Sequence, residues 1–98
     1  APFRVHLLML GKESEVGAEA ERIYSALSQA GIEVLFDDRA DVSAGEKFSD
    51  ADLLGIPYRA VVSERSIKEQ GIELKKRVEE KGKIVTLDEL LKLLVPSH

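Results

Sequence analysis

The acidic pair Asp37-Asp38 is the first candidate for chemistry in this sequence. It directly follows an apolar segment that ends at Phe36. Ligands of α/β sheets bind outside the carboxyl ends of parallel strands, so an Mg²⁺ site held by these carboxylates is one interpretation. The magnesium site of a response-regulator receiver domain, however, needs acidic residues after the first strand, whereas this pair follows the second predicted strand. We therefore favour a turn in which one aspartate forms an ion pair with Arg39.

Other catalytic motifs are absent from the sequence. The two histidines are His6, inside an apolar segment, and His98, at the C-terminus, so neither a hydrolase triad nor a histidine metal site is predicted. Gly11 stands alone where a dinucleotide-binding turn needs three glycines. The 98 residues contain no cysteine, which excludes disulfides and thiolate nucleophiles. We predict a chain without catalytic residues, a metal site or a cofactor of its own.

Length, charge and hydropathy limit the class of protein. With 98 residues, 44% hydrophobic and 33% charged, the sequence predicts one domain over residues 1–98. A net charge of −4 argues against a general DNA-binding protein, although residues 59–83 carry 8 Lys and Arg against 5 Asp and Glu. The longest apolar run, residues 7–10, is too short to cross a membrane, and no signal peptide is recognisable. We expect a cytoplasmic protein without a membrane partner.

The elements that must position any site alternate along the chain. Periodic apolar residues, capping patterns at Ser43 and Thr86, and glycines at 31 and 55 predict helices at residues 14–30, 43–54 and 86–94, the last one stopped by Pro96. β-Branched and apolar segments predict strands at residues 5–10, 32–36, 56–62, 72–78 and 84–85. This order predicts an α/β fold: a mixed five-stranded sheet, mostly parallel with an antiparallel pair at one end, flanked by three helices.

Three sequence segments resemble a known family. They are residues 34–39 (VLFDDR), residues 45–59 (GEKFSDADLLGIPYR) and residues 63–65 (SER). Together they resemble the C-terminal anticodon-binding domain of prolyl-tRNA synthetases, within the class II aminoacyl-tRNA synthetase anticodon-binding domains. The threonyl, glycyl and histidyl branches share the Gly-Ile-Pro string and remain alternatives. The resemblance implies the same α/β fold, tRNA as the partner, and a catalytic domain outside these residues that would use ATP and Mg²⁺.

The resemblance also implies a set of RNA-binding residues, namely Phe48, Asp52, Arg59, Arg65 and Ser66. They would read the two guanines of proline anticodons, which must be unstacked and recognised on their edges. A carboxylate accepts from guanine N1–H and N2–H, a guanidinium donates to O6 and N7, and Phe48 offers a stacking surface.

The residue types alone leave other interpretations open for the same side chains. Phe48 also fits a core aromatic on the apolar stripe it forms with Ala51 and Leu54. Asp52 and Arg59 also fit an exposed ion pair between the second helix and the third strand. A freestanding module of this fold that binds a protein or a small ligand is the alternative function. The start at Ala1-Pro2 rather than Met favours a domain taken from a longer chain.

Overall fold

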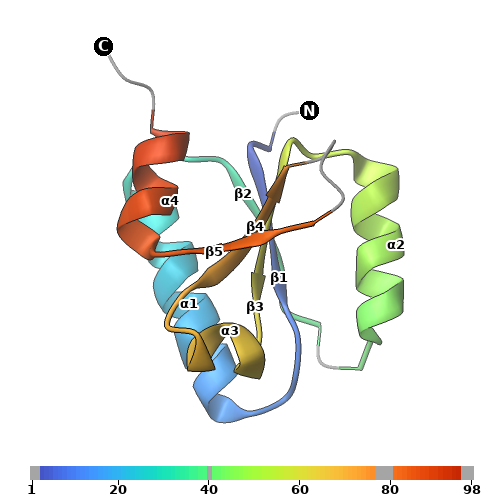
Figure 1. Cartoon of the computed structure of the whole chain (residues 1–98). Helices are drawn as coiled ribbons and strands as arrows, with labels where there is room; N and C mark the ends of the chain where they lie inside the picture. The colour runs from blue at the N-terminus through green and yellow to red at the C-terminus, as the bar shows by residue number, and fades with distance from the viewer. Residues whose placement is uncertain (1–2, 40, 77–80, 96–98) are drawn as a thin grey trace.

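The computed structural model describes residues 3–39, 41–76 and 81–95. Five strands form one sheet in the order β2-β1-β3-β4-β5. Helices α1 and α4 cover one face of this sheet and α2 covers the other (Figure 1). The strands are β1 Val5–Met9, β2 Val34–Asp37, β3 Tyr58–Val62, β4 Ile72–Lys76 and β5 Lys83–Val85. The helices are α1 Ser14–Gln29, α2 Ala44–Leu54, α3 Glu64–Lys68 and α4 Leu87–Leu94.

The pairing of the strands confirms the predicted mixed sheet. Strand β1 is parallel to both β2 and β3, whereas β3, β4 and β5 are joined by antiparallel pairing. The three predicted helices are present as α1, α2 and α4, and the structure adds the five-residue helix α3 between β3 and β4. The predicted end of the fourth strand at Val78, the stop at Pro96 and the C-terminal His98 lie outside the described residues.

Local signals explain where most of the helices begin and end. The Thr86 side chain accepts from the Glu89 amide while Glu89 accepts from the Thr86 amide, as predicted for α4. At α2, the Ser43 hydroxyl accepts from the Glu46 amide at 3.2 Å. Gly55 ends α2 with φ +64°, a left-handed conformation that glycine adopts without steric cost. No helix in the described part of the chain is long and apolar enough to cross a membrane.

Two apolar cores of unequal size lie on the two faces of the sheet. The larger core packs α1 and α4 against the sheet, with α1 contributing Val16, Ala20, Ile23 and Leu27. The smaller core under α2 contains the buried residues Leu8, Ala51 and Val61, with Leu10 and Phe48 packed against them. Helix α2 is therefore held by few apolar contacts.

The prediction that Phe48, Ala51 and Leu54 form one apolar stripe on α2 is only partly correct. Phe48 and Ala51 pack on the sheet, but Leu54 is 53% exposed. The buried residues of α2 are Lys47 and Ala51, which lie one turn apart. The Lys47 ammonium donates to the carbonyl oxygen of Met9 at 2.6 Å, and this hydrogen bond ties α2 to the end of β1.

Candidate nucleic-acid interface

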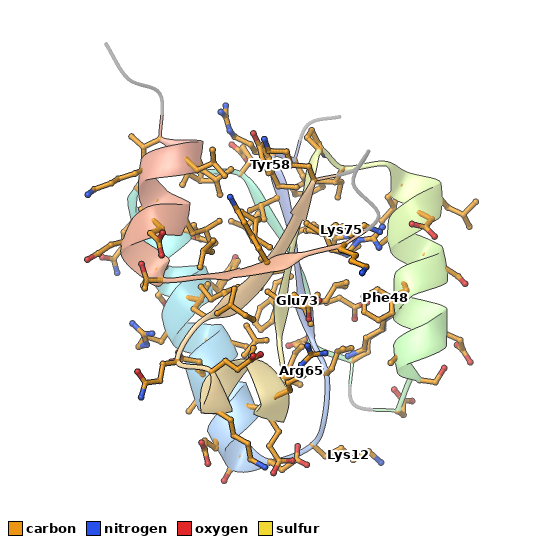
Figure 2. All side chains as sticks on the ribbon, in the orientation of Figure 1. Lys12, Phe48, Tyr58, Arg65, Glu73 and Lys75 are labelled. Atoms are coloured by element: carbon orange, nitrogen blue, oxygen red, sulfur yellow. The ribbon has the colours of Figure 1, made fainter. Side chains whose placement is uncertain are left out.

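A cavity of about 570 Å³ lies beside α2, over the face of β3 and β4. We call it the α2–β4 cavity. Figure 2 labels four of its lining residues: Phe48 on α2, Arg65 on α3, and Glu73 and Lys75 on β4. Its lining consists of Phe48, Asp52, Arg59, Val61, Arg65, Glu73, Lys75, Lys81 and Gly82.

Strand register and helix periodicity bring these residues together. Successive side chains of a strand alternate between the two faces, so Arg59 and Val61 share the α2 face while Ala60 joins the larger core. In the antiparallel pair β3–β4, Arg59 lies opposite Lys75 and Val61 lies opposite Glu73. On α2, Phe48 and Asp52 are four residues apart and so occupy the same side of the helix.

Arg59 is held by contacts with two α2 residues. Its Nη2 donates to Asp52 Oδ1 at 2.6 Å, and its guanidinium carbon lies 5.7 Å from the centre of the Phe48 ring. The Arg59 side chain is 15% exposed, whereas that of Asp52 is 73% exposed. The hydrogen bond from Arg59 lowers the pKa of Asp52 below its ordinary value. The ion pair that the sequence left open is therefore present, and it fixes the guanidinium within the cavity.

The structure brings four of the five predicted RNA-binding residues into this one cavity: Phe48, Asp52, Arg59 and Arg65. Ser66 is not in the lining. It is buried, and its hydroxyl accepts from the Ser63 amide and donates to the Ser63 carbonyl oxygen, at 2.9 Å each. The position of Ser66 is thus explained by the N-terminal cap of α3.

The remaining lining residues are not among the RNA-binding residues that the sequence predicted. Glu73 and Lys75 alternate with the buried Ile72 and Leu74, so the sequence contained the signal that they share one face. It did not contain the register that sets Lys75 opposite Arg59. Lys81 and Gly82 join the site through the close approach of the segment before β5 to β4, which only the fold reveals.

The charge of the α2–β4 cavity suits a polyanion. Among its described lining residues, four are cationic and two are acidic, which leaves a net charge of +2. The cations are Arg59, Arg65, Lys75 and Lys81, and the acids are Asp52 and Glu73. Phosphate groups are attracted by such a surface, and Phe48 adds an aromatic face on which a base can stack.

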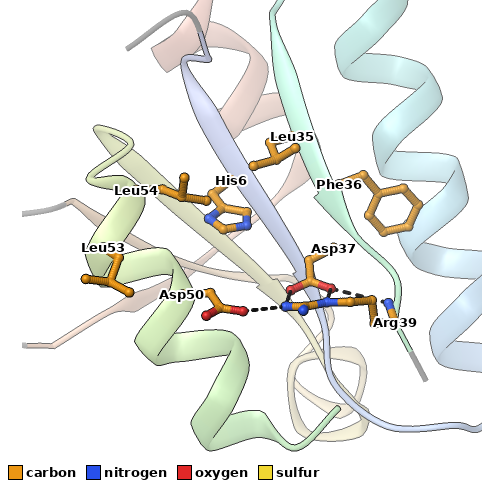
Figure 3. Close-up of a pocket in the computed structure, with 8 residues that line it drawn as sticks. All are labelled: His6, Leu35, Phe36, Asp37, Arg39, Asp50, Leu53 and Leu54. Atoms are coloured by element: carbon orange, nitrogen blue, oxygen red, sulfur yellow. Dashed lines mark hydrogen bonds and ion pairs between the residues drawn. The ribbon is translucent and has the colours of Figure 1, made fainter. Parts of the chain in front are cut away.

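A second cavity, of about 410 Å³, lies on the other side of α2, next to β2 (Figure 3). Its lining is mostly apolar, but it contains an ionic network. Arg39 donates to both carboxylate oxygens of Asp37, at 2.9 and 2.7 Å, and to Asp50 at 2.8 Å. These bonds lower the pKa of Asp37 and raise that of Arg39. The predicted ion pair with Arg39 is confirmed, and the two acids and one arginine give this second cavity a net charge of −1.

The described residues include no cluster of three or more His, Asp or Glu side chains suited to a metal ion. His6 lines the second cavity and is 3% exposed. Its Nδ1 has no hydrogen-bond partner in the described part of the chain. Burial lowers the pKa of His6, and Arg59 and Arg39 lower it further, while Asp37 and Asp50 act in the opposite direction. Burial therefore favours the neutral form of the His6 imidazole.

Comparison with known proteins identifies the class of domain. The sequence pattern of the anticodon binding domain family matches residues 4–96, and the chain belongs to that family. A proline–tRNA ligase of Persephonella marina is 46% identical over 91 residues, and one of Dehalococcoides mccartyi is 44% identical over 98 residues. These matches cover 92% and 99% of this chain but only 16% and 17% of the two ligases. The chain therefore spans about one sixth of the length of these curated relatives.

A solved structure has the same fold. The RNA binding domain of threonyl-tRNA synthetase from Cryptosporidium parvum superimposes with a TM-score of 0.84 and 22% sequence identity. The superposition covers 99% of this chain and 25% of that chain. The resemblance stated from the sequence and the predicted mixed α/β sheet are both confirmed.

Proposed function

We propose that this domain binds the anticodon loop of proline tRNA, as part of a proline–tRNA ligase, and reads its two guanines in the α2–β4 cavity. The observation that carries the proposal is the convergence of Phe48, Asp52, Arg59 and Arg65 on one cavity. The identity of 41–46% to proline–tRNA ligases supports the choice of proline among the amino acids.

The geometry of the cavity supports recognition of an unstacked base. The Phe48 ring packs under the Arg59 guanidinium, and a base that stacks beside this pair meets both an aromatic surface and a fixed set of N–H donors. Arg59 Nη2 donates one hydrogen bond to Asp52, which leaves the other N–H groups of the guanidinium for guanine O6 and N7. Arg65 is 79% exposed, and its Nε lies 3.6 Å from Glu69 Oε2. This ion pair leaves the terminal N–H groups of the guanidinium for the phosphate backbone.

The two cavities beside α2 differ in sign of charge, and this difference favours one of them for RNA. The α2–β4 cavity carries a net charge of +2, whereas the cavity next to β2 carries −1. Repulsion by the second cavity would direct the phosphates toward β4.

The chemistry of aminoacylation is assigned to the remainder of such a ligase. ATP, Mg²⁺ and proline would bind a catalytic domain outside these 98 residues, and the cytoplasm would be the place of action. We expect no proline-dependent exchange of pyrophosphate with ATP by this chain alone. Exchange above a protein-free control would contradict that assignment.

The direct test is a titration of the domain with the anticodon stem-loop of proline tRNA. A second stem-loop, in which both guanines are replaced by adenines, serves as the control for binding to the backbone alone. We expect tighter binding of the guanine stem-loop, measured by calorimetry at fixed salt. Equal affinity for the two stem-loops would contradict the reading of guanine.

A further inference from the structure

The two carboxylates of the α2–β4 cavity differ in their hydrogen-bond partners. Asp52 already accepts from Arg59 at 2.6 Å. Glu73, by contrast, has no hydrogen bond or ion pair with any residue in the described part of the chain. An acid without a partner in an RNA-binding cavity repels phosphate, so its presence there calls for a ligand group that donates hydrogen bonds.

The two acids also differ in burial and in rigidity. The Asp52 side chain is 73% exposed at the outer side of α2, where water competes for its oxygens. Glu73 is half-buried on β4, and its backbone is paired with Val61 on one side and with Ile84 on the other. A strand that is paired on both sides holds the start of the Glu73 side chain in a fixed place.

The neighbouring Gly82 leaves room for the Glu73 side chain. A Cβ atom built at Gly82 would lie 3.0 Å from Glu73 Cγ and 3.2 Å from Glu73 Oε2. Gly82 is not among the described glycines with positive φ, so its backbone conformation alone does not require glycine. The close approach to Glu73 and to the carbonyl oxygen of Leu74, at 3.1 Å, accounts for the absence of a side chain at this position.

We propose, on the basis of the function proposed above, that Glu73 is the carboxylate that reads guanine in this domain. Its two oxygens accept from N1–H and N2–H of one guanine, while Asp52 serves as the positioning residue of Arg59. Guanine is the base with two adjacent donors on its Watson–Crick edge, so a carboxylate in this place selects guanine over adenine, cytosine and uracil.

The test compares Glu73→Gln with the unchanged chain on three stem-loops. One carries both guanines of the anticodon, and in each of the other two a different guanine is replaced by inosine, which lacks only the 2-amino group. We expect wild type to bind about tenfold more weakly when inosine replaces the guanine that Glu73 reads, the effect of one hydrogen bond to a charged group. For Glu73→Gln, we expect weaker binding of the guanine stem-loop and a smaller inosine effect, because the amide keeps one acceptor oxygen but loses the charge.

Three further variants separate base reading from charge. Glu73→Asp keeps the charge but withdraws the carboxylate, and we expect it to reduce the inosine effect as Glu73→Gln does. Asp52→Asn is expected to keep the inosine effect. Glu21→Gln removes one negative charge from α1, on the opposite face of the sheet, and gives the effect of charge alone. Thermal unfolding of each variant shows whether it is folded.

The outcomes distinguish this inference from the proposed function. If wild type discriminates guanine from inosine and Glu73→Gln discriminates equally, or if Glu73→Gln binds every stem-loop more tightly, Glu73 does not read the base and the proposed function stands. If wild type binds guanine and adenine stem-loops equally, the proposed function fails and the role of Glu73 fails with it.

Discussion

Each arginine beside α2 is held by an aspartate of that helix. Arg59 pairs with Asp52 in the α2–β4 cavity, and Arg39 pairs with Asp50 in the cavity next to β2, at 2.6 and 2.8 Å. The two pairs are alike in chemistry but lie on opposite sides of one helix. They are therefore matched probes for the side of α2 that binds RNA.

We expect Arg59→Ala to weaken binding of the proline stem-loop by about 1–3 kcal/mol, the magnitude known for arginine–guanine contacts in DNA. The loss should shrink when the guanine is replaced, because the base contact is then already absent. Arg39→Ala should leave RNA affinity unchanged within error, although it breaks the ion pairs with Asp37 and Asp50. Calorimetric titration of both variants checks this, and an equal loss for both would contradict the choice of cavity.

The buried His6 makes the stability of the domain depend on pH. Burial lowers the pKa of His6 below its ordinary value of 6.5. As the pH falls below about 6.5 the unfolded chain therefore binds more protons than the folded chain, and the free energy of unfolding decreases. The paired carboxylates Asp37 and Asp52 have lowered pKa values and lose their contribution only at more acidic pH.

We expect the melting temperature of wild type to fall over this pH range and that of His6→Gln to change less. Differential scanning calorimetry at a series of pH values measures both slopes. The comparison depends on the slopes rather than on the absolute melting temperatures, so a general loss of stability in the variant does not affect it. Parallel slopes would mean that His6 titrates alike in the folded and unfolded chains.

For single residues, the sequence predicted which side chains belong to a site better than it predicted which residues they pair with. Asp37 and Arg39 are two residues apart, so their ion pair was foreseeable from the turn alone. The pair Arg59–Asp52 was one of two open interpretations, because it depends on how α2 meets β3. Glu73 was missed because its place in the cavity depends on the register of β4 with β3.

Among the elements, α2 has the most direct influence on the candidate site. It carries Phe48 and Asp52, yet its core consists of few apolar residues. The hydrogen bond from the buried Lys47 to the Met9 carbonyl oxygen is a main anchor of its N-terminal half. Loss of this bond would free α2 to shift and would disturb both lining residues.

We expect Lys47→Met to lower the free energy of unfolding by about 1–3 kcal/mol, because a buried hydrogen bond is lost while most of the apolar stem is kept. RNA affinity should fall as well, since Phe48 follows Lys47 directly. Lys92→Met, at an exposed position on α4, is the matched control and should change neither quantity. Urea unfolding and stem-loop titration measure the two effects. An unchanged unfolding midpoint for Lys47→Met would show that α2 is held by other contacts.

Element length decided which helices the sequence could predict. Helix α1 has 16 residues, and its apolar positions repeat over several turns. Helix α3 has only five residues, too few for a periodic pattern, so it was not predicted. Its signal was the pair Ser63 and Ser66, which form a reciprocal cap in which serine takes the place usually held by glutamate or glutamine.

At the scale of the whole molecule, the charge of the α2–β4 cavity is opposite in sign to the net charge of the chain. The chain carries −4, yet four cations line the α2–β4 cavity. Since acidic residues elsewhere would repel RNA, we expect only these cations to contact phosphates, and therefore a small number of phosphate contacts.

This distribution sets the salt dependence of RNA binding. Each phosphate contact on a single strand contributes about −0.7 to the slope of log K against log salt, so the four cavity cations give a slope no steeper than about −3. Between about 50 and 200 mM salt the affinity should therefore fall by up to about 50-fold. Lys81→Gln should make the slope shallower by about 0.7, whereas Lys92→Gln on the opposite face should leave it unchanged. Fluorescence anisotropy at several salt concentrations measures these slopes, and a wild-type affinity independent of salt would exclude phosphate contacts by the cavity cations.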